Sequence, residues 1–204
     1  MAREDERSAR AAESPIIGSL PPVPGILAAM RLAPGVGEHL RGLADALLVE
    51  DFPGATLTRA ERELLATATS AANDCFYCMD SHGAFAGELL ARAGVPPAPL
   101  VDAIKCGLPA GSPKLVALLA ISRTVARGAR SLTRDTVQRA LDAGATDADT
   151  QLAVLIASAF AMYNRMVDGL RAPTPPREDA YAARAVQIAD GGYSAPTAIP
   201  GTSA

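Results

Sequence analysis

The feature that most constrains the fold is a run of apolar residues at helical spacing that is broken once, at Asn73-Asp74. Before the break, Thr58 and Glu61 have the spacing of a helix capping box. The apolar positions that follow at helical intervals are Leu64, Leu65, Ala68, Ala71 and Ala72. After the break, Asn73 or Asp74 is expected to cap a second helix whose first turn contains Cys75. The sequence therefore predicts two consecutive helices that fold back on one another.

The composition favours an all-α single domain. Of the 204 residues, 49% are hydrophobic but only 4% are aromatic and none is Trp, so the core must consist largely of Ala, Leu, Val and Ile in closely packed helices. No strand–helix alternation is evident, which argues against a thioredoxin-type fold. Further helices are expected over residues 27–48 with a break at Pro34-Gly35, within residues 97–108, from Ser112-Pro113 to about Gly128, and after caps at Thr133 and Asp147.

The two ends differ in character from the middle. Residues 1–15 are charged and are expected to form a flexible N-terminal arm, and residues 16–171 the helical domain. Residues 172–204 form a proline-rich C-terminal extension, in which 179–189 could form one short helix and 191–204 are expected to lack order.

Cys75, Cys78 and His82 carry the chemistry that the sequence suggests. At about 100° per residue, all three side chains lie on one narrow stripe of a helix. Cys75 and Cys78 could close a disulfide within one turn, and His82 could contact the Cys78 sulfur. Glu63, twelve positions before Cys75, lies on the preceding helix and could orient the histidine. A thiolate, a proton donor and a second thiol are what peroxide cleavage requires.

At these residues the chain resembles the alkylhydroperoxidase D-like and carboxymuconolactone decarboxylase superfamily. The matching pattern is Glu63, eleven residues, Cys75-Phe76-Tyr77-Cys78, three residues and His82. The resemblance is specific over residues 57–86 and looser over residues 131–170. The lead-in segment LPPVPGILAAMRLAPG also looks like the peroxidase-related members.

The resemblance implies an alkylhydroperoxidase D-like helical bundle that assembles into a trimer or hexamer. It implies a hydroperoxide substrate that is attacked by Cys78, with Cys75 as the resolving thiol and a proton relay through Glu63 and His82. An external dithiol, of lipoyl type in the family, would reopen the disulfide, and no metal or organic cofactor is implied. Tyr77 stands where the well-studied peroxidase has a second histidine, so Tyr77 is a possible auxiliary group.

Other readings of the same residues remain open. The protein could be a decarboxylase-like enzyme that acts on a small lactone, with His82 as the acid or base. It could also be a non-enzymatic helical protein that binds metal through Cys75, Cys78 and His82, with Cys106 or His39 as a fourth ligand. Unreactive core cysteines are a third reading. Taken alone, Cys106 is expected to be a small buried hydrophobe and His39 a surface or boundary residue.

The net charge and the cysteine count limit the partners and the cellular location that we expect. A net charge of −3 without a basic patch gives no reason to expect a nucleic-acid partner. Three cysteines do not form a secreted disulfide framework, so a cytoplasmic location is expected. The apolar run over residues 152–163 is about half of the ~20 residues that a membrane span needs, and is expected to be buried centrally or at a subunit contact.

Overall fold

The computed structural model describes residues 2–194, and within this range the chain forms only helices. The helices are α1 (Ala2–Ala11), α2 (Ile26–Leu32), α3 (Pro34–Leu48), α4 (Arg59–Ala72), α5 (Phe76–Arg92), α6 (Ala98–Lys105), α7 (Pro113–Gly128), α8 (Arg134–Asp142), α9 (Asp147–Gly169) and α10 (Ala182–Gly191), with short 3-10 turns η1 (Ala129–Ser131) and η2 (Glu178–Tyr181). The predicted all-α class is confirmed.

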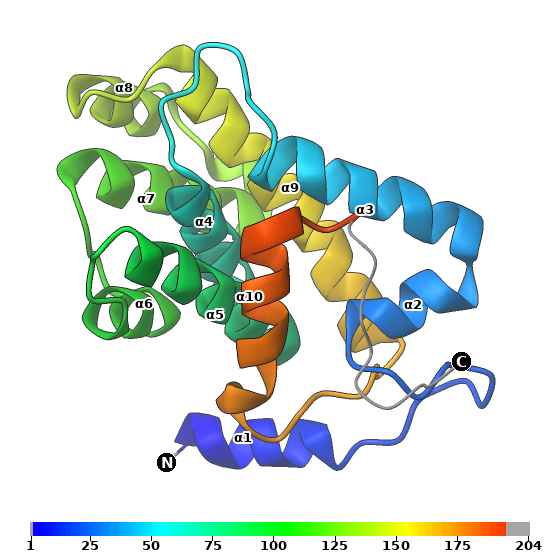
Figure 1. The fold of residues 1–204 in the computed structure, drawn as a ribbon. Helices are drawn as coiled ribbons and strands as arrows, with labels where there is room; N and C mark the ends of the chain where they lie inside the picture. The colour runs from blue at the N-terminus through cyan, green and yellow to red at the C-terminus, as the bar shows by residue number, and fades with distance from the viewer. Residues whose placement is uncertain (1, 195–204) are drawn as a thin grey trace.

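Helices α4, α5, α7 and α9 form the centre of the molecule. Helix α4 packs against each of the other three, while α2 and α3 flank α9 and α10 lies along α5 (Figure 1). The apolar stripe of α4 is buried except for the half-buried Ala72, and Leu64 belongs to the same buried cluster as Leu118 of α7 and Ile156 of α9. Helix α9 packs against six other helices, so much of its apolar run is buried within the chain itself.

The helix starts follow the capping chemistry of the sequence with two exceptions, at α9 and at α5. Thr58 and Glu61 form the reciprocal hydrogen bonds of a capping box, and Ser112 and Thr133 accept backbone N–H bonds as N-caps. The prediction that Asp147 caps α9 is wrong. Thr146 is the cap, because its hydroxyl accepts from the N–H of Asp149 while the Asp149 carboxylate accepts from the N–H of Thr146.

The break between α4 and α5 is a tight turn, as expected, but the cap differs from the prediction. Asn73 ends α4, and Asp74 adopts the left-handed conformation with φ +56° that Asn and Asp tolerate better than most residues. Cys75 itself is the N-cap of α5, with extended backbone angles. Cys75 therefore lies just outside the helix and Cys78 within its first turn.

The N-terminal segment has regular structure where none was expected. Residues 2–11 form α1, and Arg7 donates two hydrogen bonds to the buried carboxylate of Asp80 on α5, at 2.8 and 3.2 Å. Lys105 from α6 approaches the same carboxylate at 3.1 Å. Asp80 thus joins α1 and α6 to the site-bearing helix α5, although the proposed domain limits remain a prediction.

The C-terminal extension contains the expected short helix, α10, but its end is not without structure. Gly192 and Tyr193 follow α10 and pack against α3, where the carboxylate of Asp45 accepts hydrogen bonds from the backbone N–H groups of Tyr193 and Ser194, at 2.6 and 2.8 Å. The rest of the segment expected to lack order, 195–204, lies outside the described residues. Over residues 2–194 no helix is both long and apolar enough to cross a membrane.

Candidate functional site

A buried carboxylate–imidazole pair lies where α4 and α5 pack together. Glu63 on α4 is fully buried, and His82 on α5 is 7% exposed. His82 Nδ1 lies 2.7 Å from Glu63 Oε2, which is a hydrogen bond that orients the ring. The edge-to-face contacts of His82 with Phe85 and Phe160 fix the plane of the ring further. The structure thus brings together the two residues that the sequence paired.

Tyr193 completes this group from the opposite end of the chain. Its hydroxyl donates to Glu63 Oε1 at 2.6 Å and lies 3.3 Å from His82 Nδ1. Its ring stacks on the imidazole, with centroids 5.9 Å apart and planes 18° from parallel. Both carboxylate oxygens of Glu63 are therefore occupied. Burial and the nearby Glu63 carboxylate raise the pKa of Tyr193 well above its usual value, so the phenol is protonated and acts as a donor.

Cys75 and Cys78 are both reduced and both buried, at 0% and 2% exposure. They belong to an apolar cluster with Tyr77, Val167 and Tyr181. The other buried members are Leu20 from the segment before α2, Ala28 from α2 itself and Ala172 from the stretch after α9. We call residues 16–28 together with residues 170–181 the terminal cover, because both stretches flank the dithiol and shield it from solvent.

The two thiols are in different electrostatic surroundings. A hydrogen bond with Cys78 and burial raise the pKa of Cys75 well above its usual value, and the Asp168 carboxylate at the end of α9 adds to this effect. Burial also raises the pKa of Asp168, although its hydrogen bond with Cys75 and the Arg10 charge act in the opposite direction. A protonated Cys75 thiol can therefore donate to a neighbouring acceptor.

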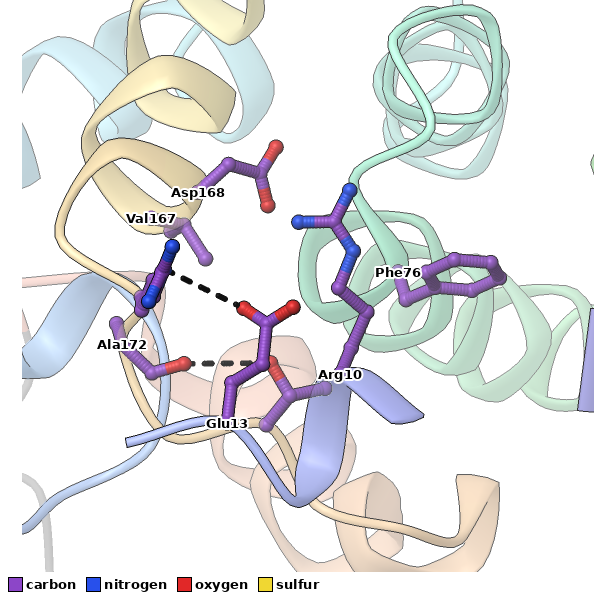
Figure 2. A pocket seen from close by; sticks show the side chains of 8 residues that line it. Arg10, Glu13, Phe76, Val167, Asp168 and Ala172 are labelled. Atoms are coloured by element: carbon purple, nitrogen blue, oxygen red, sulfur yellow. Dashed lines mark hydrogen bonds and ion pairs between the residues drawn. The ribbon is translucent and has the colours of Figure 1, made fainter. Parts of the chain in front are cut away.

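A small pocket of about 10 Å³ opens beside Asp168, about the volume that one water needs. Figure 2 shows Asp168 and Arg10 of α1 pointing toward one another across it, with Glu13 and Phe76 at its edge. Glu13 in turn faces Arg171 at 3.8 Å. This pocket is a polar opening on the Cys75 side of the dithiol.

A second, larger cavity of about 50 Å³ lies on the His82 side. His82, Tyr193 and Tyr77 form part of its wall, and Arg41 of α3 and Arg184 of α10 bring two positive charges to it. Tyr77 belongs both to this wall and to the apolar cluster around the cysteines, and it contacts Tyr181 edge-to-face at 5.6 Å. The cavity therefore approaches the dithiol with Tyr77 between them.

The remaining sequence candidates lie elsewhere. Cys106 ends α6 and is exposed, so the expectation that it is a buried apolar residue is wrong. His39 is exposed on α3, as predicted. Among the side chains that the structure describes, no group of three or more His, Cys, Asp or Glu residues is arranged to hold a metal ion. His82 Nδ1 forms its hydrogen bonds with Glu63 and Tyr193 rather than with the Cys78 sulfur.

Two residues of the site were missed by the sequence interpretation. Tyr193 follows a proline-rich stretch and two glycines, a composition that is typical of chain without order. An aromatic residue shortly after a short amphipathic helix is the signal that could have identified it. Asp168 lies at the end of a long apolar helix, and no local pattern relates it to a cysteine 93 positions away.

Comparisons with known proteins agree with the fold and with the resemblance. Residues 34–123 match the model of the carboxymuconolactone decarboxylase family. A solved structure described as an alkylhydroperoxidase AhpD core, an uncharacterized peroxidase-related protein from Ralstonia eutropha JMP134, superposes with a TM-score of 0.65 at 24% identity, over 78% of this chain and 80% of that one. No curated protein matches the chain.

A second solved structure, an uncharacterized peroxidase-related protein from Silicibacter sp. TM1040, has a TM-score of 0.65 at 20% identity. The similarity covers 84% of this chain and 93% of that chain. At these identities the two structures establish the fold, and the family match covers α3 to most of α7. The chain thus has the alkylhydroperoxidase D-like helical fold, and its residues 34–123 are similar to the carboxymuconolactone decarboxylase family.

Proposed function

We propose that this protein is a thiol-dependent peroxidase that reduces a hydroperoxide with Cys78 and Cys75. The observation that carries the proposal is the buried hydrogen bond of 2.7 Å between Glu63 and His82, one helical turn from Cys78. A buried acid–base pair beside two reduced cysteines supplies both a proton path and a pair of electrons.

The reaction balances with these groups alone. His82 takes the thiol proton of Cys78, and the thiolate attacks one oxygen of the hydroperoxide. As the O–O bond breaks, Cys78 becomes a sulfenic acid, and the departing alkoxide receives the proton from His82. The Cys75 thiol then displaces water from the sulfenic acid and forms the Cys75–Cys78 disulfide. Two thiols and one hydroperoxide thus yield one disulfide, one alcohol and one water.

The assignment of Cys78 as the attacking thiol has two supports. Cys78 lies in the first turn of α5, where the unpaired N–H groups of the helix favour negative charge. Cys75 remains protonated because its pKa is raised, so its thiol can donate to the Cys78 sulfur. We assign Glu63 and Tyr193 the role of holding the imidazole in place, and Tyr77 an auxiliary role in the cavity wall.

Turnover requires access to the dithiol, which the terminal cover shields. We expect this cover to move when substrate and reductant enter. The pocket beside Asp168 leads toward Cys75, which is the sulfur that a reductant would reach from that side. We propose an external dithiol of lipoyl type as the reductant, with no metal or organic cofactor, in a cytoplasmic homo-oligomer of three or six chains.

Single-turnover kinetics test the proposal. The prereduced protein is mixed with limiting tert-butyl hydroperoxide, and peroxide loss is followed together with the thiol count. We expect loss of one peroxide per dithiol in the wild type, and a decrease of roughly 10²–10⁴-fold in His82→Ala, the usual range for a general acid–base group. Cys78→Ser is expected to abolish the reaction. Cys106→Ser is the matched control, because Cys106 is exposed and lies outside the site, and it should react like the wild type.

A second function is favoured by the match of residues 34–123 to the carboxymuconolactone decarboxylase family. In that case His82 would transfer a proton to or from a small lactone, and the cysteines would be dispensable. The His82→Ala and Cys78→Ser variants distinguish the two functions. Turnover of a lactone that is lost in His82→Ala but retained in Cys78→Ser would establish the lactone reaction and contradict the peroxidase.

A further inference from the structure

Two guanidinium groups converge on the cavity that contains His82. Arg41 reaches it from α3 and Arg184 from α10, two helices that lie on different sides of the site. Both side chains are half-buried. The rest of the wall is mainly apolar or aromatic, with Met30 and Phe85 among its members. The volume of about 50 Å³ exceeds the ~10–15 Å³ that a single water requires.

Neither guanidinium is neutralised in the described part of the chain. Arg41 Nη1 donates to the sulfur of Met30 at 3.9 Å, and a thioether is a weak acceptor. Arg184 Nη1 donates to the neutral amide oxygen of Gln187 at 3.1 Å. A guanidinium has five N–H donors, so each arginine retains several for which the described side chains provide no carboxylate acceptor.

The carboxylates nearby already have partners. Glu63 accepts from Tyr193 and is hydrogen-bonded to His82, and Asp45 accepts two backbone N–H bonds. Burial lowers the pKa of Arg184, and the like charge of Arg41 lowers it further, against the opposing influence of Tyr77, Tyr193 and Asp45. Holding two like charges close together in a cavity that is partly shielded from water costs free energy, and a bound anion would offset this cost.

We infer that this cavity binds the carboxylate of a small organic anion, with Arg41 and Arg184 as its ligands. The inference rests on the proposed function, and it makes the substrate a hydroperoxide that carries a carboxylate. A carboxylate matches the fork of N–H donors on a guanidinium, and the apolar wall suits the organic body of such a molecule. The carboxylate at the arginines would direct the other end of the substrate toward His82.

Binding of an unreactive carboxylate tests the site independently of catalysis. Butanoate and its neutral counterpart butanol are titrated into the whole protein, and binding is followed by saturation-transfer NMR. We expect butanoate to bind at least ten times more tightly than butanol, and Arg184→Gln to lose about tenfold of that affinity. Arg41→Gln tests the second ligand in the same way, and thermal melting confirms that both variants fold. Arg177→Gln is the control, because this arginine is exposed, pairs with Asp179 and lies outside the cavity.

The outcomes are distinct. Equal binding of butanoate and butanol, or unchanged butanoate binding in both cavity variants, would overturn the inference. Tighter binding of inorganic phosphate than of butanoate would overturn the carboxylate assignment. If butanoate binds as expected but no hydroperoxide is reduced, the binding site is supported and the peroxidase proposal fails. If both hold, the kcat/KM ratio of a carboxylate-bearing hydroperoxide to tert-butyl hydroperoxide should fall about tenfold in Arg184→Gln.

Discussion

The hydroxyl of Tyr193 donates a hydrogen bond of 2.6 Å to the carboxylate of Glu63, although 130 positions separate the two residues in the chain. The contact brings the C-terminal extension into the centre of the candidate site. Asp45 fixes the backbone of Tyr193 and Ser194 from α3, so the phenol is held from two sides. A residue from the end of the chain therefore positions the imidazole that the proposed reaction needs.

Tyr193→Phe removes the hydroxyl and keeps the ring. We expect the rate of peroxide reduction to fall roughly 10–100-fold, because a hydrogen bond to a charged group contributes about 1.5–3 kcal/mol. Tyr181→Phe is the matched control. The Tyr181 hydroxyl is buried and has no hydrogen-bond partner among the described residues, so its removal should leave the rate unchanged. Equal rates in wild type and Tyr193→Phe would show that the phenol has no part in positioning His82.

Cys75 and Cys106 are expected to differ in their reaction with iodoacetamide. The thiolate is the reactive form, and both burial and a raised pKa keep Cys75 protonated at neutral pH. We predict that Cys106, which is exposed, is alkylated rapidly at pH 7.5, whereas Cys75 reacts much more slowly and its rate still increases above pH 9. Peptide mass spectrometry after timed alkylation measures both rates. A Cys75 rate equal to that of Cys106 at pH 7.5 would contradict the buried dithiol.

Asp168→Asn tests the environment of Cys75 through stability. The pKa of Asp168 is raised in the folded state, so the folded protein holds this proton more tightly than the unfolded chain does. Protonated Asp168 therefore contributes to stability below about pH 3.9, and this contribution is lost as the pH rises through the folded-state pKa. Removing the charge should therefore raise the melting temperature at pH 7, and the gain should shrink toward pH 3. Thermal unfolding of both proteins between pH 3 and pH 7 measures this difference in melting temperature. A lower melting temperature for the variant at pH 7 would contradict the assignment.

Asp80→Asn is expected to destabilise the protein by about 3 kcal/mol, because it leaves the charges of Arg7 and Lys105 beside a buried neutral group. Urea unfolding gives the free-energy difference. Glu88→Gln is the control, since Glu88 pairs with Arg92 at the surface, and it should change stability by less than about 1 kcal/mol. Equal effects of the two substitutions would mean that the Asp80 cluster does not attach α1 and α6 to α5.

Local signals in the sequence were sufficient to predict most of the helices and their limits. The capping box at Thr58 and the apolar spacing of α4 are set by residues within one helix, and so is the break at Asn73-Asp74. The tight turn brings the helices of Glu63 and His82 together, but the sequence does not give the crossing angle at which the two side chains meet. The exact cap of α5 was not predictable, because Cys75 adopts the extended conformation of an N-cap without the side-chain hydrogen bond that normally identifies one.

The rest of the site depends on contacts between distant segments. Tyr193 reaches Glu63 and His82, while Asp168 and the terminal cover reach the dithiol, and no spacing rule relates these segments to α5. The same holds for α1, whose attachment depends on Arg7 finding a buried carboxylate 73 positions away. The sequence therefore indicated the candidate residues Cys75, Cys78, His82 and Glu63 but not the residues that enclose them.

The central claim is that Cys75 and Cys78 reduce a hydroperoxide by becoming a disulfide. The most direct measurement is peptide mass spectrometry of the reduced protein before and after one equivalent of tert-butyl hydroperoxide. We predict a peptide that contains a Cys75–Cys78 disulfide and has lost two hydrogens, while Cys106 can still be alkylated. Two free thiols at Cys75 and Cys78 together with unconsumed peroxide would contradict it.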